Sequence, residues 1–285
     1  MKNTNTELGY YLAGLIEGDG NIWTWKGKSI NSSGYNYPRN PRITFAFHKK
    51  EMPFYLHLKE IFGKGTFYES KKENSNTFTY TIGDKDNIVK IINLVNGKFR
   101  TPKIEYLYKA IDYMNNIHGT NIEKLPIDNS NLLSNPWLTG MVEADGCFHI
   151  YLKGLYASND SLIRGRVICQ FELVQRKIDE ASNLSCLPFM TEIANIFQCN
   201  IRYKGDNAIF FMLQENNKHY MIKSYFDKFP LMSSKYLNYL CYIKGLNYLG
   251  KRLTNKEILE IRDIKNSMNN KRTYYNWDHL NNFYK

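Results

Sequence analysis

Apolar and polar residues alternate along the first half of the chain with two periods, that of a helix and that of a strand. An apolar stretch ends in the sequence LAGLIEGDG at residues 12–20, and helical patterns return at 53–63 and 101–114. Strand-like patterns, bounded by Gly, Pro, Asn and Ser, occupy residues 21–28, 42–48, 65–70 and 76–83. The pattern therefore predicts the element order α-β-β-α-β-β-α.

The second half repeats this order. Helical patterns occur at residues 136–146, 187–198 and 233–246, and strand patterns occur at 147–154, 167–174, 200–205 and 208–214. An internal repeat of this length predicts two halves of similar architecture. We place them at residues 1–115 and 135–285, joined by a polar linker at 116–134 that contains Gly and Pro.

Each half begins with a motif, and the two motifs align without gaps. LAGLIEGDG at residues 12–20 matches LTGMVEADG at residues 138–146. Residues with helix-capping chemistry precede both motifs, namely Thr6 in the first half and Asn135, followed by Pro136, in the second. We therefore expect a helix to begin near each of these positions and to contain the motif.

Small residues occupy one face of each motif helix. Gly14 and Gly18 lie one turn apart in the first motif, as do Gly140 and Ala144 in the second. Small side chains allow two helix backbones to approach closely. The spacing predicts that the two motif helices pack against each other along these four residues.

The aspartates that end the motifs would then lie side by side. Asp19 and Asp145 occupy matching positions. Two adjacent carboxylates repel unless a proton or a cation neutralises them, and hard divalent cations such as Mg²⁺ prefer carboxylate and carbonyl oxygens. One Asp-Gly pair alone would favour an ordinary helix C-terminus, whereas the second copy favours a metal site.

Strands that are apolar on one side need a helical layer on that side and leave the other face open. We predict that the two open faces read base edges in a DNA groove. A solvated sheet face is the alternative, but two exposed tryptophans would be unusual in it. The predicted contact residues are Asn21, Trp23, Trp25, Asn40, Arg42 and Thr44 in the first half, and His149, Tyr151, Lys153, Arg164, Arg166, Gln170 and Glu172 in the second.

Composition narrows the class of partner. The 285 residues carry a formal net charge of +11, which indicates a polyanion, with a merely solvated basic surface as the alternative. The apolar fraction of 43% supports real cores and excludes disorder for most of the chain. Heavy use of Tyr, Phe, Lys, Asn and Ile resembles proteins encoded in AT-rich organellar genomes.

The cysteines and the N-terminus bear on the compartment. The five cysteines include no CxxC pair, so we expect neither a disulfide framework nor a zinc site, and a reducing compartment fits best. The sequence shows no signal or transit peptide and no run of membrane-spanning length. We therefore expect no membrane partner, and a protein that is cytosolic or made inside its organelle.

The two motifs and the repeated element order resemble the LAGLIDADG homing endonucleases in their single-chain, two-motif form. The first motif departs from the family name only at Glu17 and Gly18, and the second keeps Gly140, Glu143 and Asp145. Residues 253–269 are similar to the closing helix of fungal mitochondrial members. The resemblance implies an α+β fold with a four-stranded antiparallel sheet in each half, forming a DNA-binding saddle with the motif helices packed at the interface. It also implies a mitochondrial, monomeric protein.

The resemblance also implies an activity. A long, nearly asymmetric DNA target would be cut on both strands, leaving short 3′ overhangs. The metal ligands would be Asp19 and Asp145 with the backbone carbonyls of Gly18 and Ala144, while Glu17 and Glu143 look structural. The expected metal is Mg²⁺, for which Mn²⁺ substitutes, and Ca²⁺ is expected to support binding without cleavage.

Members of this family hold basic and polar residues around the metals. Lys103 and Lys235 occupy matching positions in the two halves and are assigned this role, with phosphate contact or a solvated helix start as the alternative. Gln175 resembles the family's polar residue, and its first-half counterpart is Phe47 or His48. His48 could act as a general base, although a lone His at a strand end is more often structural.

Two other functions compete with DNA cleavage. An intron RNA maturase of the same fold would use a basic surface to bind its host intron RNA, with or without DNA cleavage. A DNA-binding protein descended from a decayed nuclease would be expected to lose one of the motif aspartates. Both Asp19 and Asp145 are present, which favours cleavage.

Overall fold

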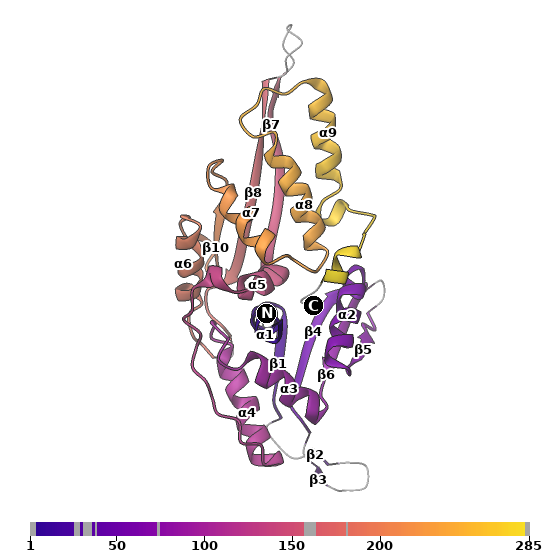
Figure 1. Ribbon diagram of the computed structural model, residues 1–285, viewed down its shortest axis with the longest axis vertical. Helices are drawn as coiled ribbons and strands as arrows, with labels where there is room; N and C mark the ends of the chain where they lie inside the picture. The colour runs from indigo at the N-terminus through magenta and orange to yellow at the C-terminus, as the bar shows by residue number, and fades with distance from the viewer. Residues whose placement is uncertain are drawn as a thin grey trace. The chain divides into compact units, whose positions relative to one another are not determined.

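The computed structural model describes residues 4–25, 29–30, 36–37, 39–72, 75–156, 164–180 and 182–282 (Figure 1). The chain forms two compact units. The first comprises Met1–Ala144, Asp179–Ser185 and Asn282–Lys285, and the second comprises Asp145–Ile178 and Cys186–Asn281. The two units do not coincide with the two sequence repeats. The second motif helix begins the second repeat, but it packs with the first unit. The predicted boundaries at residues 115 and 135 follow the repeats and stay a prediction.

The first unit contains a four-stranded antiparallel sheet of order β1-β4-β6-β5. Its strands are β1 (Gly20–Trp23), β4 (Arg42–His48), β5 (Thr66–Glu69) and β6 (Thr77–Ile82), and a separate pair is formed by β2 (Ser29–Ile30) and β3 (Asn36–Tyr37). Its helices are α1 (Thr4–Gly18), α2 (Met52–Phe62), α3 (Lys85–Val95), α4 (Ile104–His118) and α5 (Trp137–Asp145), with the 3-10 turns η1 (Lys49–Glu51) and η2 (Leu132–Ser134).

Local chemistry sets the ends of these elements. Pro53 stands in the first turn of α2, and Gly63 ends that helix with a φ of 82°, a conformation that glycine adopts without strain. Asp84 caps α3 by accepting a hydrogen bond from the backbone N–H of Asn87. Along β4, exposed and buried residues alternate, so one face of the sheet enters the core and the other is open.

The second unit has a matching sheet of order β7-β8-β10-β9, again antiparallel throughout. Its strands are β7 (Gly146–Tyr156), β8 (Arg164–Arg176), β9 (Arg202–Lys204) and β10 (Ala208–Leu213). Its helices are α6 (Leu187–Ile196), α7 (His219–Lys228), α8 (Lys235–Leu246) and α9 (Asn255–Asn266), with the 3-10 turns η3 (Asn269–Lys271) and η4 (Asp278–Asn282).

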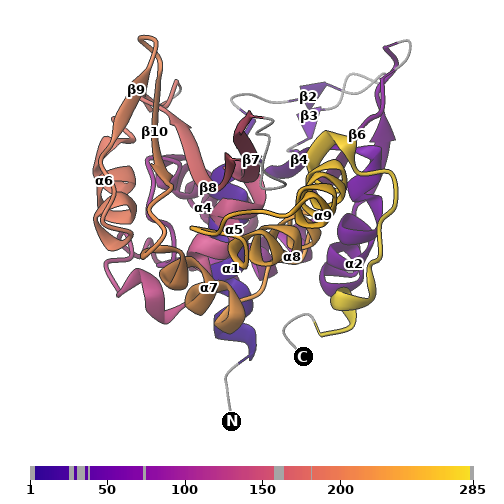
Figure 2. The same cartoon turned by 90° about the horizontal axis from the view of Figure 1, so that it is seen from above.

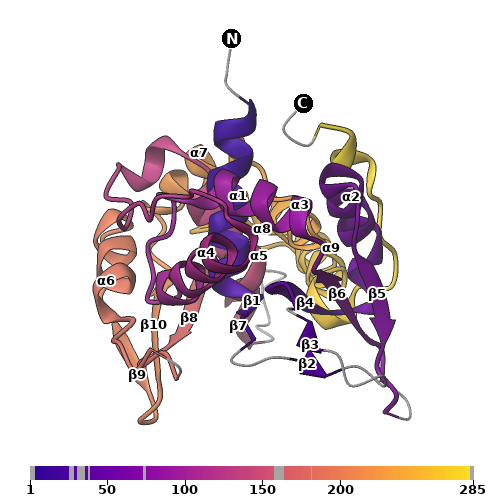
Figure 3. The ribbon, with the colours of Figure 1, turned by 90° about the horizontal axis from the view of Figure 1, so that it is seen from below.

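Helices cover one face of each sheet. In the first unit α1 contacts β1 and α3, as the view from below shows (Figure 3), and Tyr55 of α2 stacks on Phe47 of β4 with ring centroids 3.9 Å apart. In the second unit α8 lies against β7 and β8, with α9 beside it (Figure 2). Phe148, Phe171 and Phe226 form an aromatic core between strands and helices.

The predicted α+β class, with two four-stranded sheets and packed motif helices, is confirmed. Each half also contains a helix that the prediction omitted, α3 and α7. The helix α1 includes Thr4 and Asn5, so Thr6 lies inside its first turn and not at its cap, and the predicted start near Thr6 is too late. Residues 24–25 lie beyond the end of β1, and residues 26–28 of the predicted strand lie outside the described residues. No helix in the described ranges is long and apolar enough to cross a membrane.

The helices α1 and α5 cross with their backbones in direct contact. A Cβ atom on Gly14 would lie 2.0 Å from the carbonyl oxygen of Trp137, and one on Gly140 would lie 2.0 Å from that of Tyr11. Hydrogen bonds reinforce the crossing in a symmetric pair, since Trp137 donates to Glu17 and Tyr11 donates to Glu143. The predicted packing therefore occurs at Gly14 and Gly140, whereas close contact at Gly18 and Ala144 stays a prediction.

We predict that Gly140→Ala destabilises the protein. The added methyl group would overlap the α1 backbone, and such overpacking costs more than the gain in helix propensity, so the free energy of unfolding should fall by about 2 kcal/mol or more. Urea unfolding measures the change. Asn93→Ala at an exposed position of α3 is the control and should change stability by less than about 0.5 kcal/mol. Equal stability of the two variants would contradict the close crossing.

Candidate active site and nucleic-acid interface

Several backbone carbonyl oxygens lie close together where α1 ends and β1 begins. Asp19 directly follows the helix and is exposed, and its backbone N–H still donates to the carbonyl of Leu15 at 3.0 Å. Lys103, at the N-cap of α4, extends its ammonium group to this end. Its Nζ lies 3.3 Å from the carbonyl oxygen of Ile16, 3.0 Å from that of Gly18 and 2.8 Å from that of Gly20.

These contacts show that the carbonyl oxygens where α1 passes into β1 bind the Lys103 ammonium group. The last carbonyls of a helix have no intrahelical partners and form the negative end of the helix dipole. Here the carbonyls of Ile16 and Gly18 accept the ammonium, together with the Gly20 carbonyl of β1. A carbonyl oxygen has two lone pairs, so each of these oxygens can accept a second ligand. The donor set suits a hard divalent cation.

Side chains alone do not surround a metal. The described residues contain no group of three or more His, Cys, Asp and Glu side chains that could hold an ion. A cation bound at a motif aspartate would therefore need backbone carbonyls, water or substrate oxygens as further ligands. Such an open coordination sphere is typical of Mg²⁺ in phosphate chemistry.

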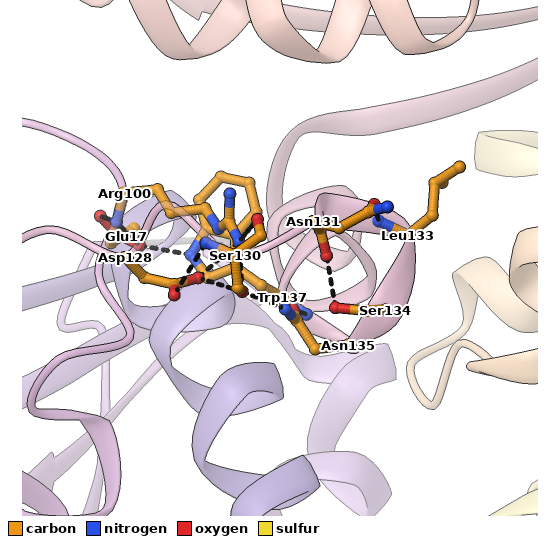
Figure 4. A network of polar contacts seen from close by, with 9 residues as sticks. All are labelled: Glu17, Arg100, Asp128, Ser130, Asn131, Leu133, Ser134, Asn135 and Trp137. Atoms are coloured by element: carbon orange, nitrogen blue, oxygen red, sulfur yellow. Dashed lines mark hydrogen bonds and ion pairs between the residues drawn. The ribbon is translucent and has the colours of Figure 1, made fainter.

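Glu17 anchors the end of α1 through a buried network of hydrogen bonds (Figure 4). Its buried carboxyl group accepts hydrogen bonds from the backbone N–H groups of Arg100 and Thr101 and from the indole of Trp137. The guanidinium of Arg100 pairs with Asp128 and stacks over the Trp137 ring at 5.6 Å. The network therefore joins the first motif, the loop before α4, the linker and the start of the second motif.

The start of α5 belongs to the same network. Ser130 accepts hydrogen bonds from the guanidinium of Arg100 and from Asn135, whose own carbonyl side chain accepts the backbone N–H of Trp137 at 3.1 Å. Asn135 thus caps the second motif helix, as the sequence predicted. Glu17 is a structural residue here, because its carboxyl group is fully engaged away from solvent.

The second motif aspartate has a different neighbour. The Oδ2 atom of Asp145 accepts a hydrogen bond of 2.6 Å from the side-chain amide of Gln175. Both side chains are half-buried. Lys235 begins α8 and is also half-buried, and its charge acts on the pKa of Cys147 in β7, which burial raises overall. These are three of the residues assigned to the catalytic machinery of this half.

The strand registers identify the first-half counterpart of Gln175. Gly20 pairs with Phe45 in the first sheet, and Gly146 pairs with Leu173 in the second. Counting onward by two residues makes Phe47 the equivalent of Gln175. Phe47 is buried and stacks on Tyr55, whereas His48 follows at the exposed end of β4 and accepts the backbone N–H of Lys50. The two halves therefore differ chemically beside their aspartates.

The open face of the first sheet carries four of the six predicted contact residues. Asn21 pairs across the strands with Thr44, and Trp23 pairs with Arg42, with Trp23 36% exposed. Trp25 lies beyond the strand, 4.9 Å from the Trp23 ring and beneath the guanidinium of Arg39. Asn40 precedes β4 and is bound to Gly83 and His118. Asn40 and Trp25 thus lie off the strands that carry the rest.

The open face of the second sheet carries those predicted residues whose side chains the structure describes. Lys153 pairs with Arg166 and His149 pairs with Gln170, while the ring of Tyr151 stacks on that of His149 at 5.8 Å. Gln170 is only 5% exposed, because it exchanges hydrogen bonds with Glu172 and Gln214. Arg164 begins β8, and its side chain lies outside the described residues.

Sequence reasoning missed polar residues at the end of β8 and on the outer strands β5 and β9. Arg176, Arg202 and Lys204 occupy the open face of the second sheet around Ala208 and Phe210. Tyr68 pairs with Thr79 on the open face of the first sheet. The sequence of β10 does not identify this face, because all six of its residues are apolar, and only the structure shows that every second one enters the core. The short strand β9 has no alternating signal either.

The fold, the paired motifs and the helix ends together define a LAGLIDADG-type protein, and comparison with known proteins agrees. The sequence profile of the LAGLIDADG endonuclease family matches residues 12–114 and 138–246, so the chain belongs to this family.

Individual relatives and structures show how far the similarity extends. The intron-encoded DNA endonuclease aI3 of Saccharomyces cerevisiae is 31% identical over 100% of this chain and 75% of its own length. The intron-encoded RNA maturase bI4 of the same yeast is 27% identical over 54% of this chain and 21% of its own length. The crystal structure of the homing endonuclease I-SmaMI bound to cleaved DNA has the same fold, with a TM-score of 0.66, 19% identity, and coverage of 93% of this chain and 97% of that chain.

We predict that the Glu17 carboxyl group makes stability pH-dependent. Burial raises its pKa from 4.5 to about 7, although its hydrogen bonds act in the opposite direction. A carboxyl group with a raised pKa binds its proton more tightly in the folded state, so its contribution is complete below about pH 4.5 and is lost as the pH rises to about 7. The loss should reach about 3 kcal/mol.

Urea unfolding at pH 4.5 and pH 7.5 tests this for the wild type and Glu17→Gln. The free energy of unfolding of the wild type minus that of Glu17→Gln should be larger at pH 4.5 than at pH 7.5 by about 3 kcal/mol. Glu123→Gln, at an exposed position, should follow the wild type at both pH values. A difference between wild type and Glu17→Gln that does not change with pH would show that the Glu17 pKa is unshifted.

Proposed function

We propose that this protein is a site-specific homing endonuclease that makes a double-strand break in a long, nearly asymmetric DNA target and leaves short 3′ overhangs. The observation that carries the proposal is the pair of crossed motif helices, each of which places an aspartate at the same distance along the chain from its contact glycine, Gly14 or Gly140. Two basic or aromatic sheet faces accompany them. Family membership and the similarity to a yeast DNA endonuclease support the same activity.

We infer that divalent cations bind at the two motif ends. Asp19 with the carbonyl of Gly18, and Asp145 with the carbonyl of Ala144, would be the ligands, with Mg²⁺ as the metal, Mn²⁺ as a substitute and Ca²⁺ supporting binding only. When bound, such a metal supplies Lewis acidity and an activated water for phosphodiester hydrolysis. The matching positions of Asp19 and Asp145 in the two motifs, together with family membership, support these sites.

The chain's own residues would prepare the two aspartates differently. Lys103 fixes the last carbonyls of α1, and so holds the Gly18 oxygen in place. Gln175 orients the Asp145 carboxylate through its amide. Lys235 is assigned to the solvent around the second aspartate. Gln175 has no polar equivalent on the other side, because Phe47 is packed into the core there.

The partner, the oligomeric state and the cellular location are inferred from the same observations. The partner would be double-stranded DNA, bound by a monomer because one chain contains both motifs. The net charge of +11 supports DNA as the partner. The organellar composition and the intron-encoded relatives support a mitochondrial location.

A second candidate is an intron RNA maturase of the same fold. The partial similarity to the yeast maturase favours it as an additional activity. Splicing of the host intron in a purified system separates the two activities, because it should not depend on the motif aspartates. Splicing without any DNA cleavage would replace the endonuclease proposal.

We predict that Asp19→Asn and Asp145→Asn each abolish double-strand cleavage and leave DNA binding within a few-fold of the wild type. Selection of cleaved sequences from a randomised DNA library first identifies the target. Cleavage in Mg²⁺ and binding in Ca²⁺ are then measured on that target. Asp86→Asn, an exposed carboxylate on α3, is the matched control and should cut normally. Full cleavage by either motif variant would refute the metal-ligand assignment.

We also predict that the two strands respond unequally to Gln175→Leu. Loss of a hydrogen bond to a carboxylate costs about 1.5–3 kcal/mol, which corresponds to roughly tenfold or more in rate if it is expressed in the transition state. Only cleavage of the DNA strand that is cut at Asp145 should slow. A supercoiled plasmid should therefore accumulate as a nicked circle before it becomes linear. Equal slowing of both strands, with no nicked intermediate, would exclude this role of Gln175.

A further inference from the structure

A small pocket lies in the second unit at the free edge of its sheet. It has a volume of about 260 Å³, and β7 and the segment from α9 to η3 line it with His149, Ile150, Tyr151, Lys265, Met268, Asn269, Asn270 and Lys271. In the described sheet β7 is an edge strand. The rings of His149 and Tyr151 belong to the open face of that strand, while Ile150 and Met268 are buried.

The C-terminal segment is fixed on this edge by Asn269. Its backbone has a φ of 53°, in the left-handed region that few residues other than glycine adopt, and asparagine is among those that do. Its side-chain amide donates to the carbonyl oxygen of Phe148 in β7, and its backbone N–H donates to the side chain of Asn238 in α8, each at 2.9 Å. Because strand, helix and turn are held together, the pocket wall is pre-formed.

The lining is suited to an anion. It contains two lysines, one histidine and two asparagines, and no carboxylate. Lys271 is held beside the pocket by the side chain of Asn266, whose oxygen lies 3.2 Å from Nζ. Pockets for drug-sized ligands are usually about 300–1,000 Å³, so a volume of about 260 Å³ suits a smaller group such as a phosphate with its water.

We propose that this pocket binds a backbone phosphate of the DNA target, beside the base-reading face of the second sheet. The proposal rests on the DNA-binding function proposed above and adds a contact site to it. DNA is favoured over RNA because His149 and Tyr151 belong both to the pocket and to the open face of β7. A phosphate held by Lys265 and Lys271 fixes the register of the duplex along the strand and carries no sequence information itself.

The salt dependence of binding to the selected DNA target tests this site. Each phosphate contact adds about 0.9 to the slope of log K against log salt concentration. Lys265→Met with Lys271→Met should make the slope shallower by about 1 and weaken binding about fivefold at 0.15 M salt. The matched control is Lys256→Met with Arg262→Met, which removes two exposed charges from α9 outside the pocket.

Neutral phosphates locate the contact on the DNA. Single methylphosphonate substitutions are stepped through both flanks of the target. One position should weaken wild-type binding about fivefold and have no further effect on the lysine variant, because the two changes remove the same interaction. Lys271→Met alone, at an exposed position, gives a partial effect at the same phosphate, and thermal unfolding checks that the variants fold.

The outcomes are distinct. A slope change equal to that of the control pair, or no methylphosphonate position that couples to the lysines, would overturn the phosphate site while the nuclease proposal stands. Weakened binding of intron RNA with unchanged DNA binding would assign the pocket to RNA and overturn the proposal. A wild-type protein that binds no DNA at all would overturn both proposals.

Discussion

The structure of the first unit depends on the direct contact between α1 and α5. Gly14 and Gly140 allow the two backbones to meet, and no larger side chain fits at either position because a Cβ atom would overlap a carbonyl oxygen at 2.0 Å. The crossing brings the indole of Trp137 to Glu17 and the hydroxyl of Tyr11 to Glu143. The glutamates of the two motifs therefore hold the helices together.

The ends of the two motif helices share a plan but differ in their surroundings. The carbonyl oxygens of Ile16 and Gly18 in α1 and of Gly20 in β1 bind the Lys103 ammonium, whereas Asp145 accepts a hydrogen bond from a neutral amide, that of Gln175. The strand register places the buried ring of Phe47 where Gln175 stands in the other half. Because one chain contains both halves, the residues at these equivalent positions can differ.

Much of this architecture could be predicted from the sequence, because the repeat, the motif glycines and the alternation of β4 are local patterns. The helix α3 was missed although Asp84 caps it and Ile88, Ile91, Ile92 and Val95 follow with helical spacing, and that signal was available. Other features depend on tertiary contacts. Nothing near Arg100 indicates that its backbone N–H binds Glu17, and nothing near Gln170 indicates that Gln214 would help to bury it. The pocket beside His149 arises only when the segment after α9 folds onto β7.

The central claim is that Asp19 and Asp145 are both ligands of divalent cations that act on DNA. The most direct test is a crystal structure of the wild-type protein with its target in Mn²⁺, in which anomalous scattering locates the metal independently of the refined coordinates. The expected result is Mn²⁺ peaks at bonding distance from the carboxylates of both aspartates and next to phosphate oxygens. Peaks at other side chains, with both carboxylates free of metal, would contradict it.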